Sequence, residues 1–346
     1  ARHQLAQPRA ALAVLREFEN RRRDGKCLLP GGHRREALTA ADRVGQVLLA
    51  LRCERGLRVE QIHLRRCAGL EEDLGDGDIT TSALFSKPVP AQASIIAQQP
   101  LVVAGLAAAV QTFLMVDPSL RLTTHTHDGD RLPVGAALLD IDGDGRSILR
   151  AERVALNFLQ HLSGIATLTD RFCRAVRHTP AQILDTRKTL PGWRSLQKWA
   201  VALGGGTNHR FSLGDGLLIK DNHLALLQKG RQAVRTACRL ARRDASRAVP
   251  LIVEVETLAD VRQALAGKAD IVLLDNMTPA MVRQAVTLIK RRAIVEVSGG
   301  ITLKNVRAMA QAGADRISIG ALTHSAPAAT MSLELTPVRR ARRPRA

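Results

Sequence analysis

Charged side chains follow the ends of apolar runs in the second half of the sequence. The runs are rich in Ile, Val and Leu and cover residues 182–185, 217–219, 251–255, 270–274, 293–297 and 316–319. Cations follow the early runs, namely Arg187, Lys188, Arg210 and Lys220, with His209 beside them. Carboxylates come at the ends of two later runs, at Glu254 and Asp275. Because functional groups collect at the carboxyl ends of parallel strands, this order predicts one site with a basic wall and facing acids.

The basic wall (Arg187, Lys188, Arg210 and Lys220) comes from three segments, TRKTLPGW, GGGTNHR and LGDGLLIKDNH. Arg binds carboxylates and phosphates through two parallel hydrogen bonds, and Lys acts as a mobile point charge. A solvated surface is the usual explanation for charge, but these segments are otherwise apolar and rich in glycine. Converging cations would repel one another unless a multiply charged anion lay between them. Thr186 adds a hydroxyl, and residues 204–206, all glycine, let the backbone approach a ligand closely.

The two acids leave several roles open. Glu254 and Asp275 could hold Mg²⁺ through water, contact ribose hydroxyls or stabilise a cationic centre. A helix N-cap or a salt bridge with a neighbouring cation is an equally simple explanation. Glu256, two residues beyond Glu254, is interpreted as its structural companion.

Two later runs end in small residues. Ser298-Gly299-Gly300 ends one run, and Ser318-Ile319-Gly320 ends the next. Ordinary turns between a strand and a helix also use Gly, but two consecutive ends of this kind favour a phosphate held by amide N–H groups. The complete set of residues therefore predicts a phosphorylated sugar joined to an anionic partner.

The elements that carry these residues alternate along the chain. Apolar spacing predicts helices over 226–243, 257–267, 278–290 and 302–312. Strands and helices that alternate with a spacing of about 20–25 residues indicate βα units. They therefore predict a parallel barrel or a doubly wound sheet. An α+β unit is expected before them, with strands at 94–97, 101–103 and 138–141, a helix over 104–115 and a long helix over 151–176. Helices are also expected over 1–20, 37–52 and 58–70, and a disordered basic end over 338–346.

The composition excludes several classes of protein. The 346 residues include 51 Lys plus Arg and 32 Asp plus Glu, which gives a formal charge of +19. A hydrophobic fraction of 45% excludes a disordered chain, and no apolar run is long enough to cross a membrane. Only 2% of the residues are aromatic, so base stacking on a nucleic acid is not expected. Five dispersed cysteines fit a reducing compartment, and residues 1–23 fit an exposed amphipathic helix better than a transit peptide.

Longer motifs resemble those of the quinolinate phosphoribosyltransferase family, also called nicotinate-nucleotide pyrophosphorylase (carboxylating). In chain order they are EDLGDGDITT from Glu72, AERVALN from Ala151 followed by HLSGIAT, DTRKT from Asp185, Pro191-Gly192, GGGTNHR ending at Arg210, LIKDNH ending at His223, VEVET around Glu254, LLDNM around Asp275 and SGGI from Ser298. Their length and order make the resemblance specific, and it covers residues 58–330.

The resemblance implies a type II phosphoribosyltransferase fold, in which an N-terminal α/β sandwich lies beside an incomplete seven-stranded α/β barrel. The expected divisions are a helical and linker extension over 1–57, the sandwich domain over 58–163, the barrel domain over 164–330, and a return segment with a basic tail over 331–346. The implied activity is that of a cytoplasmic enzyme of NAD biosynthesis. It joins quinolinate to 5-phosphoribosyl 1-pyrophosphate and releases pyrophosphate and CO₂, which gives nicotinate mononucleotide.

The resemblance also implies a role for each site residue. Substrate binding would fall to Arg153, Thr186, Arg187, Lys188, His209, Arg210, Lys220, Glu254 and Asp275, and catalysis to Lys188, Glu254 and Asp275. Mg²⁺ would be the cofactor, held by Glu254 and Asp275 through water. The 5-phosphate would bind Ser298, Gly299, Gly300, Ile319 and Gly320. The family implies a homodimer in which Arg153 reaches the partner's site, with assembly beyond the dimer left open and no specific nucleic acid or membrane partner.

Three residues depart from the family pattern. Ser212 stands where Gly is usual, which predicts a narrower loop or a different turn. Gln197 replaces a common acid and Trp199 a common Tyr, which predicts changes in packing. A paralogue acting on another acceptor, such as the molybdenum-transport-associated group, is one alternative, but the complete set of cations argues against it. Nucleic-acid binding through the Arg-rich ends is an alternative from another class, and the shortage of aromatic residues argues against it.

Overall fold

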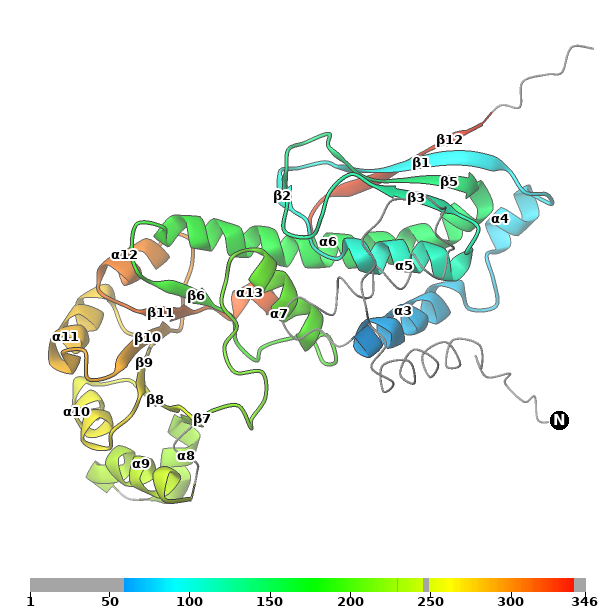
Figure 1. Cartoon of the computed structure of the whole chain (residues 1–346). Helices are drawn as coiled ribbons and strands as arrows, with labels where there is room; N and C mark the ends of the chain where they lie inside the picture. The colour runs from blue at the N-terminus through cyan, green and yellow to red at the C-terminus, as the bar shows by residue number, and fades with distance from the viewer. Residues whose placement is uncertain (1–58, 229, 245–248, 339–346) are drawn as a thin grey trace, which may run out of the picture. The chain divides into compact units, whose positions relative to one another are not determined.

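The computed structural model of the protein describes residues 59–228, 230–244 and 249–338 (Figure 1). The helices expected over 1–20 and 37–52 lie outside these residues, and so does the basic end from residue 339 onward. The domain boundaries expected from the resemblance (1–57, 58–163, 164–330 and 331–346) stay a prediction.

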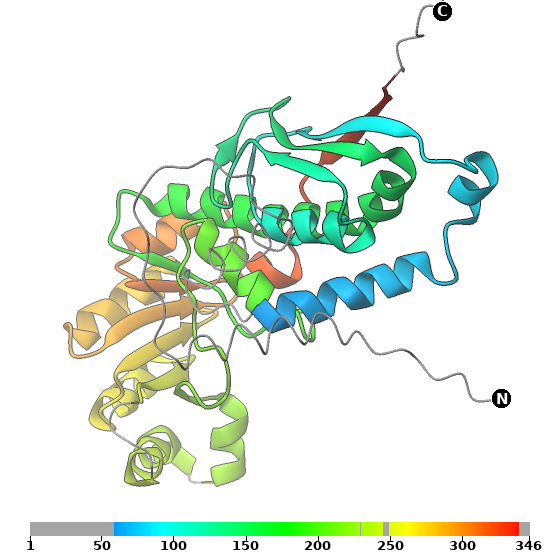
Figure 2. The same cartoon turned by 45° about the vertical axis from the view of Figure 1, so that its right-hand side comes forward.

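The first sheet carries the β-rich part of the expected α+β unit. Within the described residues it has four antiparallel strands, in the order β12 (Met331–Pro337), β1 (Pro90–Ala97), β5 (Ala137–Asp144) and β3 (Arg121–Thr124). The end of the described chain therefore returns to pair with β1 (Figure 2). Alternate residues of β1 are buried, because α5 (Leu106–Val116) and α6 (Gly145–Val176) cover one face of the sheet. The short strands β2 (Leu101–Val102) and β4 (Arg131–Leu132) pair with each other.

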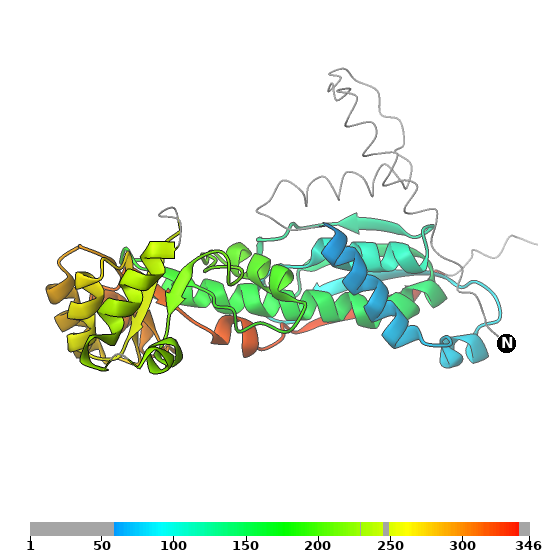
Figure 3. The ribbon, with the colours of Figure 1, turned by 90° about the horizontal axis from the view of Figure 1, so that it is seen from below.

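Helix α6 connects the two sheets. It begins earlier than the expected start at 151, because the Asp144 carboxylate accepts the Arg146 N–H and caps the helix at Gly145. Helix α3 (Val59–Leu74) packs against α5 and α6 (Figure 3), and α4 (Ile79–Leu84) follows it. Across the part of the chain that the structure describes, no helix is both long enough and apolar enough to span a bilayer.

The second sheet confirms the α/β fold class. Its strands in the described residues are six and parallel, in the order β6 (Gln182–Leu184), β11 (Arg316–Ser318), β10 (Ile294–Ser298), β9 (Ile271–Asp275), β8 (Leu251–Val255) and β7 (Leu217–Ile219). Each expected apolar run forms a strand to within one residue at either end. The expected seventh strand is reduced to a parallel bridge between Leu184 and Thr207, next to β6.

Helices follow the strands of this sheet. They are α7 (Arg194–Leu203), α8 (Asp221–Leu227), a 3₁₀ turn (Gly230–Gln232), α9 (Ala233–Asp244), α10 (Leu258–Ala266), α11 (Pro279–Ile289), α12 (Val306–Gln311) and α13 (Ala321–His324). The single helix expected over 226–243 is divided, because α8 ends at Gln228 in the left-handed conformation (φ 50°). The expected helix over 302–312 starts later, at Val306.

The two faces of the parallel sheet differ in what covers them. Residues such as Val253, Val272 and Val295 are buried against helices α10, α11 and α12 in the main core. The residues between them in sequence point to the opposite face, since side chains alternate along a strand. A small separate cluster of Ile252, Ile271, Leu273, Leu218 and Ile294 lies on that face.

The strand register places the acids on the face opposite the main core. Glu254 of β8 and Glu296 of β10 both pair with Leu273 of β9, so these three side chains share one face. Asp275 pairs with Ser298 two positions further along the strands, so these two side chains lie on the same face. The carboxyl edge of this face is therefore where the predicted site residues must meet.

Candidate active site

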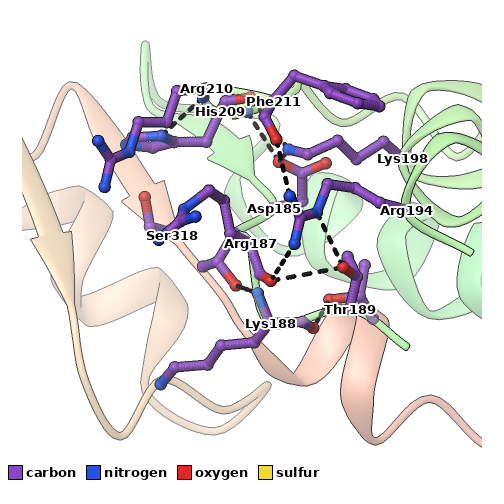
Figure 4. Close-up of polar contacts among 12 residues, drawn as sticks. Asp185, Arg187, Lys188, Thr189, Arg194, Lys198, His209, Arg210, Phe211 and Ser318 are labelled. Atoms are coloured by element: carbon purple, nitrogen blue, oxygen red, sulfur yellow. Dashed lines mark hydrogen bonds and ion pairs between the residues drawn. The ribbon is translucent and has the colours of Figure 1, made fainter. Parts of the chain in front are cut away.

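Two loops at the carboxyl edge supply most of the basic wall (Figure 4). The first loop (residues 185–190) follows β6, and the second loop (residues 207–216) precedes β7. Arg187, Lys188 and Arg210 extend from these loops to the same side in Figure 4. Burial lowers the pKa of Arg210, and the nearby positive charge of Arg187 lowers it further. The predicted convergence of these two arginines is therefore present.

A buried ion pair connects the two loops. Asp185 and Lys198 are both almost fully buried, and Lys198 Nζ lies 2.5 Å from Asp185 Oδ1. Lys198 Nζ also donates to the His209 carbonyl at 3.0 Å, and the His209 N–H donates to Asp185 Oδ1 at 2.8 Å. Burial raises the pKa of Asp185 and lowers that of Lys198, and each shift is opposed by the charge of the partner. The pair thus fixes the backbone that presents His209 and Arg210.

Gln197 joins the first loop to two other segments. Its Oε1 accepts the Leu190 N–H at 3.0 Å, and its Nε2 donates to the Thr323 carbonyl at 3.2 Å. Nε2 also lies 2.9 Å from Nε2 of His161, which must then be an unprotonated acceptor. Burial lowers the pKa of His161, in agreement with a neutral ring. Gln197, predicted to alter only packing, therefore makes buried hydrogen bonds to three segments. An ionised acid could not replace it, because it has no N–H to donate.

His209 has both ring nitrogens engaged by the protein. Nδ1 accepts the Arg210 N–H at 2.8 Å, so the proton belongs to Nε2, which lies 3.1 Å from Glu296 Oε1. The Ser318 hydroxyl donates to the same oxygen of Glu296. The second oxygen of Glu296, which is fully buried, has no hydrogen-bond partner among the described residues. In this arrangement His209 orients the Arg210 backbone, and its substrate-binding role stays a prediction.

Glu296 and Lys198 were not predicted from the sequence. Glu296 interrupts the apolar run AIVEV in the same way that Glu254 interrupts LIVEV, so a charged residue inside a buried strand was an available signal. Lys198 stands among the apolar residues of α7, and its burial against Asp185 depends on contacts distant in sequence.

Lys188 lies over the end of β11. A side chain at Gly320 would come within 3.0 Å of Lys188 Cδ and 3.1 Å of His324 Nε2, so only glycine leaves this space open. The Thr323 hydroxyl donates to the Lys188 carbonyl at 2.6 Å, which ties the first loop to the residues after β11. Thr186 contributes its hydroxyl oxygen to the Lys188 N–H at 3.0 Å.

The predicted phosphate site has free amide groups. Gly299 (φ 86°) and Gly300 (φ 61°) adopt left-handed conformations, and a Cβ at Gly299 would overlap the side chain of Asn276. In the portion described, the N–H groups of Gly299, Gly300 and Gly320 donate no hydrogen bond to the protein. Ile319 differs, because its N–H donates to the Leu184 carbonyl at 2.9 Å and its side chain is buried.

The two predicted acids have different surroundings. Glu254 accepts a short hydrogen bond from Lys220, the residue after β7, so one cation of the basic wall is paired with one acid. Asp275 is partly exposed at the end of β9, where its Oδ2 accepts the Asn276 amide at 2.8 Å. The salt bridge and the ligand-binding roles that the sequence left open are both compatible with this placement.

Arg153 and Ser212 lie apart from this cluster of contacts. Arg153 is exposed on α6, and among the described residues it makes no hydrogen bond or ion pair with the other site residues. Ser212 has no positive φ, and its hydroxyl accepts the Gly214 N–H at 3.2 Å. Asp215 Oδ2 accepts the N–H groups of Phe211 and Ser212 at 2.9 and 2.8 Å, so the second loop closes with Ser in place of Gly.

Comparisons with known proteins agree with this arrangement. The family model described as quinolinate phosphoribosyl transferase, N-terminal domain, matches residues 78–163, and the model described as its C-terminal domain matches residues 165–334. The probable nicotinate-nucleotide pyrophosphorylase (carboxylating) of Bacillus subtilis is 40% identical over 265 residues, which cover 77% of this chain and 90% of that protein. The protein of the same name from Methanocaldococcus jannaschii is 39% identical over 275 residues, 77% of this chain and 94% of that one.

Solved structures with a similar fold cover most of the chain. The crystal structure of NadC from Streptococcus pyogenes has a TM-score of 0.76 at 39% identity and covers 83% of this chain and all (100%) of that one. The nicotinate-nucleotide pyrophosphorylase from Francisella tularensis has a TM-score of 0.75 at 35% identity, with 81% and 98% covered.

Replacing Lys198 by Met should destabilise the protein by about 3–5 kcal/mol, because Asp185 would be left as an unpaired buried charge. Urea unfolding measures this loss. The double variant Lys198→Met with Asp185→Asn should recover part of it, since no buried charge then remains. A single variant within about 1 kcal/mol of the wild type would show that the pair does not fix the loops.

His161 should make the protein less stable in mild acid. Burial lowers its pKa in the folded state, so as the pH falls through 6.5 the unfolded ring takes up a proton before the folded ring does. Stability is therefore complete above this pH and declines below it. The free energy of unfolding measured at pH 7.5 and 5.5 should fall more in the wild type than in His161→Gln, and an equal fall in both would contradict a buried neutral ring.

Proposed function

Since the chain belongs to the quinolinate phosphoribosyl transferase family, we propose that it joins quinolinate to 5-phosphoribosyl 1-pyrophosphate and removes one carboxylate as CO₂. The products are nicotinate mononucleotide and pyrophosphate, which makes this a step of NAD biosynthesis. The observation that carries the proposal is that Arg187 and Arg210 extend to the same side from the two loops (Figure 4), where the charge of Arg187 lowers the pKa of Arg210. Two arginines this close favour a dianion between them.

Quinolinate supplies that dianion. Its two carboxylates are on adjacent ring atoms, and each accepts hydrogen bonds from a guanidinium. Thr186 and His209 lie in the same two loops, so they are the neighbouring groups that orient the ring. Binding two anionic reactants side by side is itself a large part of the rate enhancement, because it removes the entropy cost of their encounter.

Positive charge develops on the ribose ring as its bond to pyrophosphate breaks. Glu254 and Asp275 lie on neighbouring strands and on the face of the sheet that carries the site, where carboxylates stabilise such a cation. Lys188 and Lys220 provide positive charge for the departing pyrophosphate. The pairing of Lys220 with Glu254 holds both side chains in place before the substrate arrives.

The acceptor ring drives the second step. Once the quinolinate nitrogen is bonded to ribose, the ring is a cation and accepts the electron pair released as the adjacent carboxylate leaves. The carbon then takes up a proton. No protein nucleophile is needed, and the residues of the basic wall act by binding and orientation.

Mg²⁺ fits the donor set as an ion that is bound mainly by the substrate. Proteins commonly hold Mg²⁺ through one or two carboxylates together with substrate phosphates and water. Glu254 and Asp275 provide two such carboxylates, and the described chain has no cluster of three side chains suited to a resident metal. When bound, the ion would neutralise charge on the diphosphate. The free amides of Gly299, Gly300 and Gly320, with Ser298, would receive the 5-phosphate.

A homodimer would complete the site. Arg153 follows Arg150 by one turn of α6, and Arg150 Nη2 lies 3.5 Å from Ser82 Oγ of α4. The exposed large apolar side chains of the described residues include Ile79 and Leu84 on α4, and Leu190, Phe211 and Leu213 around the two loops. A two-fold interface that covers both places would bring Arg153 to the partner's site.

The proposed reaction is tested by following nicotinate mononucleotide formation from quinolinate, 5-phosphoribosyl 1-pyrophosphate and Mg²⁺. Arg187→Ala should lower kcat/KM by about 10³-fold or more, since a charge-assisted contact to the substrate is lost. Asp260→Ala is the control, because it removes a half-buried carboxylate of the first turn of α10 that, within the described residues, accepts hydrogen bonds only from Thr257 and Gln263. Product formed from another acceptor and none from quinolinate would identify a paralogue instead.

Subunit sharing of Arg153 predicts complementation. Arg153→Ala and Arg187→Ala should each be inactive alone, because every site lacks one arginine. Mixing them under conditions of subunit exchange should restore about a quarter of wild-type activity, since half of the dimers then carry one intact site of two. If the activity of the mixture is no higher than that of the separate variants, Arg153 acts in its own chain's site or in no site.

A further inference from the structure

Arg194 lies between the two loops and donates to both (Figure 4). Its Nε donates to Thr189 Oγ1 at 3.0 Å, and its Nη1 donates to the Phe211 carbonyl at 3.1 Å. Its Nη2 lies 3.5 Å from the Arg187 carbonyl, which is a long and weak contact. The Thr189 N–H donates to that same carbonyl at 2.9 Å. One planar guanidinium therefore joins Thr189, two residues after Arg187, to the backbone of Phe211, the residue after Arg210.

Helix stability does not explain a cation at this position. Arg194 is the first residue of α7, where the helix dipole disfavours positive charge. In the described chain its donors go to neutral hydroxyl and carbonyl oxygens and it forms no ion pair. Its contribution is therefore the geometry of its fork, with several donors in one plane, rather than neutralisation of a carboxylate.

We propose that Arg194 is a positioning residue that sets the separation of Arg187 and Arg210, and thereby makes the site select a ring with two adjacent carboxylates. The proposal rests on the proposed function, because it concerns recognition of the same acceptor. A diacid needs both arginines at one matching separation. A monoacid needs only one arginine, so it tolerates a change in that separation.

Lysine cannot replace this fork. The acceptors Thr189 Oγ1 and the Phe211 carbonyl belong to different loops, and a single ammonium has no rigid pair of donors to span them. Lys198, one turn later on the same helix, fixes the same two loops through Asp185 and the His209 carbonyl. Loss of the Arg194 fork should therefore relax the spacing while the buried ion pair keeps the fold.

The test compares two unreactive ligands, benzene-1,2-dicarboxylate and benzoate, by calorimetry on the full-length wild type, Arg194→Lys and Thr189→Val. Arg194→Lys should weaken dicarboxylate binding by about tenfold or more and change benzoate binding by about twofold or less. Thr189→Val, which removes only one acceptor, should shift the ratio of the two affinities in the same direction by a smaller factor. In turnover, KM for quinolinate should rise more than KM for 5-phosphoribosyl 1-pyrophosphate.

Arg131→Lys is the matched control, because Arg131 also uses two donors, to Asp170 Oδ1 at 3.1 and 2.7 Å, but lies outside the two loops. It should leave both affinities unchanged. The positioning role would be overturned if both ligands lost affinity equally. It would also be overturned if neither Arg194→Lys nor Thr189→Val weakened dicarboxylate binding. A wild type that makes no product from quinolinate and does not prefer the dicarboxylate would instead refute the proposed function.

Discussion

The ion pair between Asp185 and Lys198 is the constraint on which the candidate site depends. Both side chains are removed from water, so each charge is tolerated only because the other is in contact with it. Asp185 stands at the carboxyl end of β6, and the pair reaches the second loop through both backbone groups of His209. Arg187 and Arg210 would otherwise repel each other, and this rigid support beneath them keeps the two charges close before an anion binds.

The parallel sheet and α7 position different parts of the candidate site. The register of the parallel strands brings Glu254, Asp275 and Ser298 to one face, so the part of the site proposed to bind the sugar is a consequence of backbone pairing. The part proposed to bind the acceptor consists of the two loops, which are held in position by polar side chains of α7. Gln197 extends the same support to the residues after β11, where Thr323 meets Lys188. One short helix thus ties the loops on either side of it to a segment more than 100 residues later in the sequence.

Periodicity and strand ends predicted a large part of this arrangement. The apolar runs located every strand of the parallel sheet, because a strand buried on both faces is continuously hydrophobic. Glu254 and Asp275 were found because an acid at the end of such a run is conspicuous. The reach of Lys198 to Asp185 and that of His209 to Glu296 could not be predicted, because they depend on tertiary contacts that no local pattern records. Gln197 was interpreted as packing, since nothing near it in the sequence reveals its partners His161 and Thr323.

A crystal structure of the wild-type protein with bound quinolinate tests the central claim most directly. If the supported loops form a receptor for a dianion, one carboxylate should lie within hydrogen-bonding distance of Arg187 and the other of Arg210, with both loops unmoved. The Arg153 guanidinium nearest the ligand should come from the partner subunit. Quinolinate bound away from these arginines, or bound only after the Asp185–Lys198 contact has opened, would contradict the claim.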